Sequence, residues 1–411
     1  MDQLLRSHAD SIVAASIRAV LPDEAVKRAL DGASLTGRIV LVAAGKAAWQ
    51  MAAAAAETLG DRIHRGVVVT KYDHVKGPIP HVDCYEAGHP VPDENSYRAT
   101  QAAIDAVSGL TEEDTVLFLL SGGGSALFEK PLIPGEDLTR LTQELLACGA
   151  DIVEMNTVRK RFSAVKGGKF AVLCAPARVY AVVLSDIIGD PLDMIASGPA
   201  YPDSSTAEQA LAIAEKYHLT LTDQMRSLLN VETPKSLSNV TTQITGSVKE
   251  LCRAAAEACR NLGYEPLVLT ASLSCTARDA GVMLANIAQY YQHSEKSLAF
   301  LMGGETVVQL TGHGKGGRNQ ELALAAAPGI AGLGGAAVFS LGSDGTDGPT
   351  DAAGGYADSE TWATLKEKGL EIYRVLQDND AYHALEASGG LIKTGATGTN
   401  VNDVSILLLH K

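Results

Sequence analysis

The stretch Thr115-Val-Leu-Phe-Leu-Leu-Ser-Gly-Gly-Gly-Ser-Ala-Leu-Phe128 decides the fold of this chain. Residues 115–120 are β-branched, aromatic or aliphatic without polar alternation, which is typical of a strand covered on both faces in a parallel sheet. Ser121, three glycines and Ser125 follow. Glycines after a strand let the backbone turn tightly, and a helix that opens near Ser125 would attract an anion to its N-terminus. The stretch predicts a phosphate-binding loop, with a plain tight turn as the alternative.

This loop does not match the common nucleotide-binding fingerprints. A G-x-G-x-x-G motif would need glycine where Leu127 stands, and every Gly-Lys pair lacks the following Ser or Thr of a Walker A loop. Any phosphate site here must therefore be of another kind.

Length and composition indicate a globular enzyme. The 411 residues suffice for two or three domains, and 46% hydrophobic with 20% charged residues is ordinary for a soluble protein. No apolar run approaches the roughly 20 residues that span a bilayer, and the N-terminus lacks a secretory-signal layout. Six scattered cysteines without a C-x-x-C pair predict reduced thiols. We therefore expect a cytoplasmic protein that does not associate with membranes.

The charge balance narrows the choice of partner. With 34 basic and 48 acidic residues the net charge is −14, which argues against general binding to nucleic acids or anionic membranes, because both need broad positive fields. A small anionic substrate remains compatible, since a few local lysines and arginines can dominate one cleft.

Strand and helix signals alternate along the chain, which predicts an α/β fold. A polar segment at 230–239 that contains Pro234 is the expected domain boundary. Strands are expected before it at 38–44, 66–70, 115–120 and 179–184, and after it at 266–270, 298–302, 336–341 and from 404 onward.

Lys46 follows the buried strand 38–44 and precedes an alanine-rich helix. In open parallel sheets, ligands bind at the carboxyl edge of the strands. A lysine near a helix N-terminus opposes the helix dipole, so its position suggests an anion between them. A solvated surface lysine is the alternative.

Two later segments carry similar chemistry. The glycine-rich run 312–321 leads into a helix with Lys315 and Arg318 at its start, and the forked donors of arginine suit phosphoryl oxygens. Aspartates just past strand ends commonly hold Mg²⁺ through one or two carboxylates; the candidates are Asp186, Asp190, Asp344 and Asp347. The loop that holds Asp344 and Asp347 is also explained by its turn-rich composition alone.

Other charged and titratable groups stand out less. Five basic residues lie between Arg159 and Lys169, although a solvated helix face would look the same. Among the ten histidines, His89 and His313 lie inside glycine-rich loops. Backbone N–H groups, a lysine, an arginine and carboxylates at strand ends are the parts that phosphoryl transfer needs.

Taken together, the motifs of this chain resemble those of the glycerate 2-kinases of the MOFRL family, which have historically also been called hydroxypyruvate reductases. The resemblance covers nearly the whole chain, in segments at 45–48, 88–93, 121–127, 156–159, 185–190, 196–199, 303–306, 314–321, 344–351 and 397–403. Ala396 and Phe162 are small departures from the family pattern.

The resemblance implies a two-domain α/β protein with the active site in the cleft between the domains. Residues 1–238 would form an N-terminal Rossmann-like domain with a parallel sheet flanked by helices, and residues 239–411 a C-terminal MOFRL-type α/β domain with a mixed sheet. It further implies that D-glycerate and ATP, with Mg²⁺ or another divalent cation, give 2-phosphoglycerate and ADP. A monomer or a homodimer is expected.

The resemblance also suggests roles for individual residues. Lys46 and Arg318 would be catalytic and neutralise the migrating phosphoryl group. Nucleotide binding is assigned to Ser121, Gly122, Gly123, Gly124, Ser125, Lys315 and Asn319. Arg159 and Glu305 would bind glycerate, and the metal would be held by Asp186, Asp190, Asp344 and Asp347.

Two other functions compete with the kinase. An NAD(P)H-dependent hydroxypyruvate reductase would act on a related substrate, but the dinucleotide fingerprint with its trailing ribose-binding acid is missing. A non-catalytic nucleotide or sugar-acid sensor would not require so many charged groups at one place.

Overall fold

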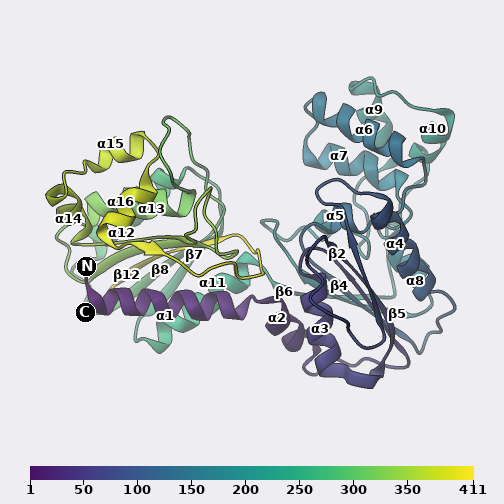
Figure 1. Cartoon of the computed structure of the whole chain (residues 1–411), viewed down its shortest axis with the longest axis horizontal. Coiled ribbons are helices and arrows are strands. Elements are labelled where there is room, and N and C mark those ends of the chain that lie inside the picture. Colours follow the sequence, from purple (N-terminus) through teal and green to yellow (C-terminus); the bar gives the residue numbers. More distant parts are fainter. The chain divides into compact units, whose positions relative to one another are not determined.

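Two six-stranded sheets organise the chain, which the computed structural model describes from residue 1 to residue 411 (Figure 1). The first sheet lies in a unit made of Pro22–Ser185 and Asp190–Thr245, here called the glycine-loop unit. The second lies in a unit made of Met1–Leu21, Asp186–Gly189 and Gly246–Lys411, here called the C-terminal unit. No helix has the length and apolar content needed to cross a membrane.

The sheet of the glycine-loop unit has the strand order β3-β2-β1-β4-β5-β6. Adjacent strands from β3 to β5 pair in parallel. The order reverses between β1 and β4, which is the switch point where open α/β sheets bind ligands. The predicted Rossmann-like sheet is confirmed. Its strands are β1 Ile39–Ala44, β2 Ile63–Lys71, β3 Val82–Ala87, β4 Thr115–Leu120, β5 Arg178–Leu184 and β6 Val240–Gly246.

Every residue of β1 and β4 is buried, as expected for central strands without polar alternation. Helices flank the sheet, and a separate cluster of α6, α7, α9 and α10 has its own apolar core. The helices are α2 Pro22–Leu30, α3 Ala48–Leu59, α4 Glu94–Ala106, α5 Gly124–Leu127, α6 Gly135–Ala147, α7 Ile152–Arg159, α8 Lys169–Cys174, α9 Ala207–Lys216 and α10 Asp223–Leu229, with short 3₁₀ turns at Gly60–Arg62, Lys160–Phe162 and Ile195–Ser197.

The sheet of the C-terminal unit is mixed, as predicted. Its order is β11-β10-β9-β12-β8-β7; β7 and β8 are parallel, and the other neighbours are antiparallel. The strands are β7 Glu265–Leu273, β8 Leu298–Gly304, β9 Ala336–Gly342, β10 Gly354–Asp358, β11 Leu391–Ile392 and β12 Asp403–Leu409.

Helices cover both faces of this second sheet (Figure 1). Helices α1 and α11 share one apolar core with the sheet, and α12 and α13 share another on the opposite face. The helices are α1 Gln3–Ala19, α11 Val248–Asn261, α12 Ala277–Tyr291, α13 Arg318–Ile330, α14 Thr361–Glu367, α15 Ile372–Gln377 and α16 Ala381–Ser388.

The unit boundaries differ from the expected division into 1–238 and 239–411. Helix α1 belongs to the C-terminal unit because its apolar residues, among them Leu5 and Ile12, pack in the same core as α11. Strand β6 completes the first sheet, which moves the main boundary to Thr245 and Gly246. The sequence order of the elements does not show which sheet a helix packs on.

Candidate active site

The loops that follow β1 and β4 are hydrogen-bonded to each other at the switch point. The Lys46 backbone N–H donates to the Gly122 carbonyl at 2.9 Å, and the Ala47 N–H donates to Ser121 Oγ at 3.1 Å. Gly45 has a φ of 124°, and a Cβ there would lie 2.3 Å from Ser121 Oγ. Only glycine fits this contact, so Lys46 and the glycine loop form a single site in the glycine-loop unit.

Gly123 lies in a narrow space beside two side chains. It adopts a left-handed φ of 85°, and a Cβ would lie 3.0 Å from Cδ2 of His89 and 3.1 Å from Cγ of Lys46. Gly124 is similarly confined, because a Cβ there would lie 2.7 Å from Cβ of Ala196. A helix opens at Gly124, as expected, but α5 is only four residues long. These glycines allow the backbone of the loop to come close to its neighbours, and this matters more here than the dipole of so short a helix.

His89 is a neighbour of the site that the sequence marked only by its glycine-rich surroundings. Its ring is half-buried, and burial followed by the positive charges of Lys46 and Lys71 lowers its pKa. A neutral imidazole beside the loop adds hydrogen-bonding capacity without adding charge.

The Lys46 side chain is exposed, and no carboxylate of the glycine-loop unit pairs with its ammonium group. A flexible lysine next to backbone N–H groups is suited to an anion such as a phosphate. Its full charge is available to a ligand.

Ser125 is held by groups whose supporting role was not predicted from the sequence. Its carbonyl accepts a 2.7 Å hydrogen bond from Nζ of Lys166, a fully buried lysine that also pairs with Glu129 at 3.2 Å. Burial lowers the pKa of Lys166, and Glu129 opposes that shift. Ser125 Oγ lies 3.3 Å from Oγ of Ser197, which donates to Oδ1 of Asn156 at 3.0 Å. The loop is thus supported from inside the protein.

The segment that supports Ser125 is itself strained. Ala196 and Ser197 are consecutive left-handed residues with φ of 50° and 62°. Such conformations cost about 1–3 kcal/mol each and are often found at functional sites. No sequence signal distinguishes this strained turn from an ordinary Ala-Ser-Gly-Pro loop.

Arg159 ends α7 and is half-buried, and its Nε has no hydrogen-bond partner. Its positive charge adds to the lowering of the pKa of the buried Lys166, whose ammonium group donates to the Ser125 carbonyl of the glycine loop. Its assignment to glycerate stays a prediction.

Arg318 is the first residue of α13 in the C-terminal unit, and two carboxylates hold its guanidinium. Nε and Nη2 donate to the two oxygens of Asp403 at 2.5 and 3.0 Å, and Nη1 lies 3.0 Å from Oε1 of Glu305. About a third of the Arg318 side chain stays exposed. Burial raises the pKa of Asp403, and the paired Arg318 opposes that rise. Glu305, predicted to bind substrate, is therefore in contact with the predicted catalytic arginine.

Asp347 caps the helix that carries Arg318. Its carboxylate accepts hydrogen bonds from the N–H groups of Asn319 at 3.1 Å and Gln320 at 2.9 Å. A Cβ at Gly317 would lie 2.2 Å from Cγ of Asp347, so glycine is required there. Burial raises the pKa of Asp347 to about 6. The carboxylate assigned to a metal thus fixes the start of α13.

Asn319, assigned to nucleotide binding, is buried and bonded within the unit. Its Nδ2 donates to Asp347 at 3.2 Å, and its Oδ1 accepts from Ser340 Oγ at 2.5 Å. Lys315 places Nζ 4.1 Å from the centre of the Tyr382 ring, a cation–π contact.

The remaining aspartates are divided between the two units. Asp186 belongs to the C-terminal unit, where its carbonyl accepts from Nδ2 of Asn402 at 3.2 Å, and Asp190 belongs to the glycine-loop unit. Asp344 closes a local turn by accepting from the N–H of Thr346 at 2.9 Å. No group of three or more His, Cys, Asp or Glu side chains is arranged to hold a metal ion. This donor set fits a metal held by one or two carboxylates together with substrate phosphates.

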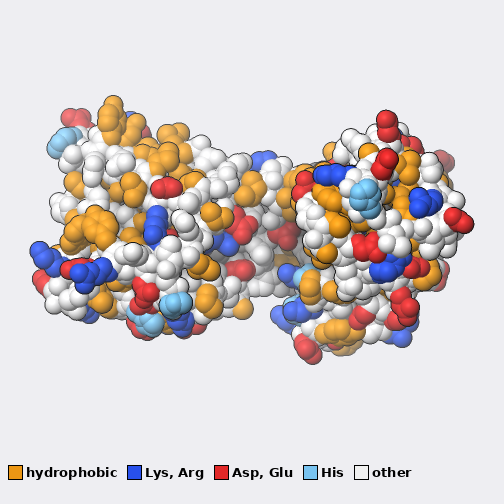
Figure 2. Space-filling view, turned by 90° about the horizontal axis from the view of Figure 1, so that it is seen from above, with side chains coloured by type: hydrophobic (Ala, Val, Ile, Leu, Met, Phe, Trp, Pro, Cys, Tyr) orange, Lys and Arg blue, Asp and Glu red, His pale blue; other side chains and the backbone are white.

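The molecular surface agrees with a local anion site. Figure 2 shows basic and acidic side chains interspersed over the visible face, without a broad positive field.

The fold and the site define an α/β enzyme of the Rossmann strand order with a glycine loop and a lysine at its switch point. A family described as "Domain of unknown function (DUF4147)" matches residues 8–230, and the MOFRL family matches residues 298–403. The chain is 52% identical to a D-glycerate 2-kinase of Thermotoga maritima, over 98% of both chains. It is 40% identical to a glycerate 2-kinase of Pyrococcus horikoshii, over 91% of this chain and 88% of that protein.

The solved structures agree with these relatives. A crystal structure of glycerate kinase from Thermotoga maritima superposes with a TM-score of 0.94 at 51% identity, covering 99% of this chain and 100% of that chain. The chain belongs to the glycerate 2-kinase family and combines a DUF4147 region with a MOFRL region. The family predicted from the sequence motifs is confirmed.

Proposed function

We propose that this chain is an ATP-dependent kinase that phosphorylates the 2-hydroxyl of D-glycerate, giving 2-phosphoglycerate and ADP. The observation that carries the proposal is the hydrogen-bonded pair of loops at the switch point, which joins Lys46 to the glycine loop in a chain of this family. Phosphoryl transfer depends mainly on positioning and on neutralising charge, and these groups supply both.

In this proposal the loop 121–125 holds nucleotide phosphates through its backbone N–H groups. The Lys46 ammonium, which has no carboxylate partner in its unit, neutralises the transferred phosphoryl group. His89 stands next to both and would complete the wall of the site. Lys166 would keep the loop in place through its bond to the Ser125 carbonyl.

Arg318 would serve the same reaction from the C-terminal unit. Asp403 fixes two of its donors, while the more exposed Glu305 holds the third nitrogen. An anionic ligand that displaced Glu305 would meet an already oriented guanidinium. Lys315 is proposed to assist with phosphates, and Arg159 to bind the glycerate carboxylate.

ATP is proposed to bring Mg²⁺, which would supply positive charge that neutralises the phosphates. Asp186, Asp190 and Asp344 remain candidates for its protein ligands. Asp347 is the weakest of the four, because both of its oxygens cap α13. Six free cysteines and the use of ATP fit a cytoplasmic location.

Two assays on the purified protein test this function. The first follows ADP formed from ATP, Mg²⁺ and D-glycerate, and the second follows loss of NAD(P)H with hydroxypyruvate. We expect glycerate-dependent ADP release and no hydride turnover. Hydride turnover without ADP release would establish the reductase instead. Phosphorus NMR of the product then distinguishes a phosphate on C2, coupled to one proton, from a phosphate on C3, coupled to two.

A further inference from the structure

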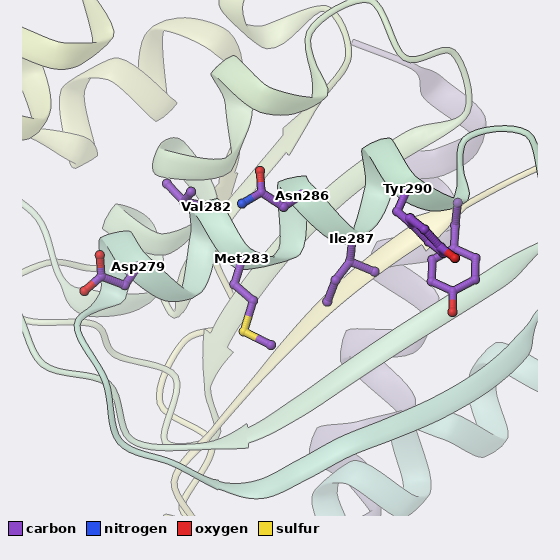
Figure 3. A pocket seen from close by; sticks show the side chains of 7 residues that line it. Asp279, Val282, Met283, Asn286, Ile287 and Tyr290 are labelled. Carbon is purple, nitrogen blue, oxygen red and sulfur yellow. The ribbon is translucent and has the colours of Figure 1, made fainter.

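A shallow hollow of about 390 Å³ on helix α12 contains little that could do chemistry (Figure 3). Its one charged side chain is Asp279, whose carboxylate already accepts a hydrogen bond from Oγ1 of Thr276 at 2.6 Å. The rest of its lining is mostly apolar or aromatic: Val282, Met283, Ile287, Tyr290 and Tyr291. An unpaired acid–base group lies instead beside the glycine loop of the first sheet.

That group is the imidazole of His89, which comes two residues after the end of β3. Strands β1 to β4 are parallel, so His89 lies at the same carboxyl edge of the sheet as Lys46 and the glycine loop. A Cβ on Gly123 would lie 3.1 Å from Nε2 of His89 and 3.1 Å from Cγ of Lys46. The imidazole and the lysine therefore approach the same residue of the loop.

The segment 88–93 fixes the position of His89. Asp93 caps α4, where its carboxylate accepts from the N–H of Ser96 at 3.0 Å. A Cβ on Gly88 would lie 3.0 Å from Oδ2 of Asp93, so the turn that carries His89 packs closely against this cap. The ring is thus attached to the start of a helix rather than to a free loop.

Neither ring nitrogen of His89 has a hydrogen-bond partner in the protein, although the ring is half-buried. The charged groups that act on it are Lys46 after β1 and Lys71 at the end of β2. The glycine loop adds no charge, and the carboxylate of Asp93 is committed to its cap. Burial and the two lysines lower the pKa of His89. The imidazole is therefore neutral at neutral pH and able to accept a proton.

Other polar side chains of the loop are already engaged. The hydroxyl groups of Ser121 and Ser125 both have hydrogen-bond partners. Glu129 is fully buried and paired with Lys166. His89 thus supplies a proton acceptor that these groups do not.

We propose that His89 is the general base of the reaction and accepts, at Nε2, the proton of the hydroxyl group that is phosphorylated. This assignment rests on the proposed kinase function. As Nε2 takes the proton, the hydroxyl oxygen forms a bond to the γ-phosphorus of ATP. The bond from that phosphorus to the β,γ-bridging oxygen breaks and releases ADP. The imidazolium then gives the proton to solvent, while Lys46 neutralises the phosphoryl group in the same step.

The first test is the turnover of His89→Gln, which keeps a polar side chain but cannot accept a proton. A general base contributes typically about 10²-fold or more, so kcat should fall about 100-fold. The KM values for ATP and D-glycerate should change less than about threefold, because only the chemical step is affected. His64→Gln, at an exposed histidine near the other end of β2, is the matched control and should keep the wild-type kcat. A His89→Gln variant with wild-type kcat, or with only its KM raised, overturns the proposal.

Chemical rescue separates proton transfer from a structural role. His89→Ala leaves space at a half-buried position that added imidazole can enter, and imidazole should raise its kcat at least about tenfold. In a series of substituted imidazoles, the rescued rate should rise with the pKa of the added base. Lys46→Met should not respond, because it lacks a charge rather than a proton acceptor. A His89→Ala variant that is insensitive to all of these bases overturns the proposal.

The pH dependence gives an independent readout. Below the pKa of His89, kcat/KM of the wild type for D-glycerate should fall about tenfold per pH unit, and His89→Gln should lack this acid limb. Lys71→Met removes one of the two cations that lower this pKa, so its acid limb should move to higher pH. An acid limb that is unchanged in both variants assigns the base to another residue.

The same assays separate this inference from the function on which it rests. A wild-type chain that releases no ADP with ATP, Mg²⁺ and D-glycerate contradicts the kinase function and the general base with it. An active wild type with equally active His89 variants contradicts the assignment of the base alone.

Discussion

Lys46 and Arg318, the two cations predicted to be catalytic, have opposite surroundings. Lys46 extends from the switch-point loop with no carboxylate partner in its unit, whereas Arg318 is held by Asp403 and Glu305 at the start of α13. A free lysine can follow a moving charge but must be ordered by the ligand. A paired arginine is oriented beforehand, although its charge is partly offset by its partners.

The largest expected effect is on turnover. Lys46→Met and Arg318→Met should each lower kcat roughly 10³-fold or more, as loss of a charge-stabilising group does in phosphoryl transfer. Arg318→Lys should recover little, because lysine cannot donate to both oxygens of Asp403 in a fork. Steady-state ADP release measures this, with circular dichroism to show that each variant is folded. Near-normal turnover in either variant removes that residue from the mechanism.

The contact between the two loops should be the next most sensitive feature. Gly45→Ala would place a methyl group 2.3 Å from Ser121 Oγ, so we expect turnover to fall 10- to 100-fold and the protein to be destabilised by about 2–3 kcal/mol, within the range of strained backbone and overpacked sites. Gly109→Ala, also at a positive φ but with nothing within 4 Å, is the control for backbone strain alone. Equal losses in both variants would mean that the loop contact is unimportant.

Removing the orientation of Arg318 should have a smaller effect than removing Arg318. Asp403→Asn keeps the shape but loses the charge-assisted bidentate pair, so we expect kcat to fall about tenfold and stability by about 1.5–3 kcal/mol. Glu305→Gln removes the more exposed partner and should change stability by less than about 1 kcal/mol. Measuring both denaturant unfolding and kcat on the same samples would compare the Asp403→Asn and Glu305→Gln variants. A larger loss for Glu305→Gln would reverse the roles of the two carboxylates.

The smallest effect concerns pH. The pKa of Asp347 is about 6 in the folded chain, against about 3.9 when unfolded. The Asp347 carboxyl group therefore stays protonated to a higher pH in the folded state than in the unfolded state. Its contribution to the free energy of unfolding then decreases as the pH rises from about 4 to about 6, by up to about 2–3 kcal/mol. Asp347→Asn, which retains a capping oxygen, should gain stability relative to wild type over that range. A difference between the two proteins that is constant with pH would contradict this.

Much of the fold was predictable from the sequence because its central strands are short runs without polar alternation, each followed by glycine within two residues. Thr115–Leu120 and Ile39–Ala44 are of this kind, and both are central in the sheet. The position of α1 was not predictable, because its apolar face would fit either sheet and only packing against α11 decides between them.

The candidate site was predicted in part. The glycine loop and Lys46 directly follow predicted strands, so both could be identified as candidates from the sequence alone. Asp403 could have been noticed as the one charged residue of the strand Asp403–Leu409, but its pairing with Arg318 joins residues 85 positions apart. Lys166 and Ser197 act from beneath the loop through tertiary contacts. The basic run 159–169 and the segment 196–199 were noticed in the sequence, but this supporting role was not predicted from them. Asp347 was predicted to be a metal ligand, and its visible role is to cap a helix.

A double-mutant cycle tests most directly whether the free lysine and the paired arginine act on one transferred phosphoryl group. ADP release would be measured for wild type, Lys46→Met, Arg318→Met and the double variant under saturating substrates. If both cations stabilise the same transition state, the double variant should be about as slow as the slower single variant, because groups that act as a unit are strongly non-additive. Losses that simply multiply would show that the two residues act independently.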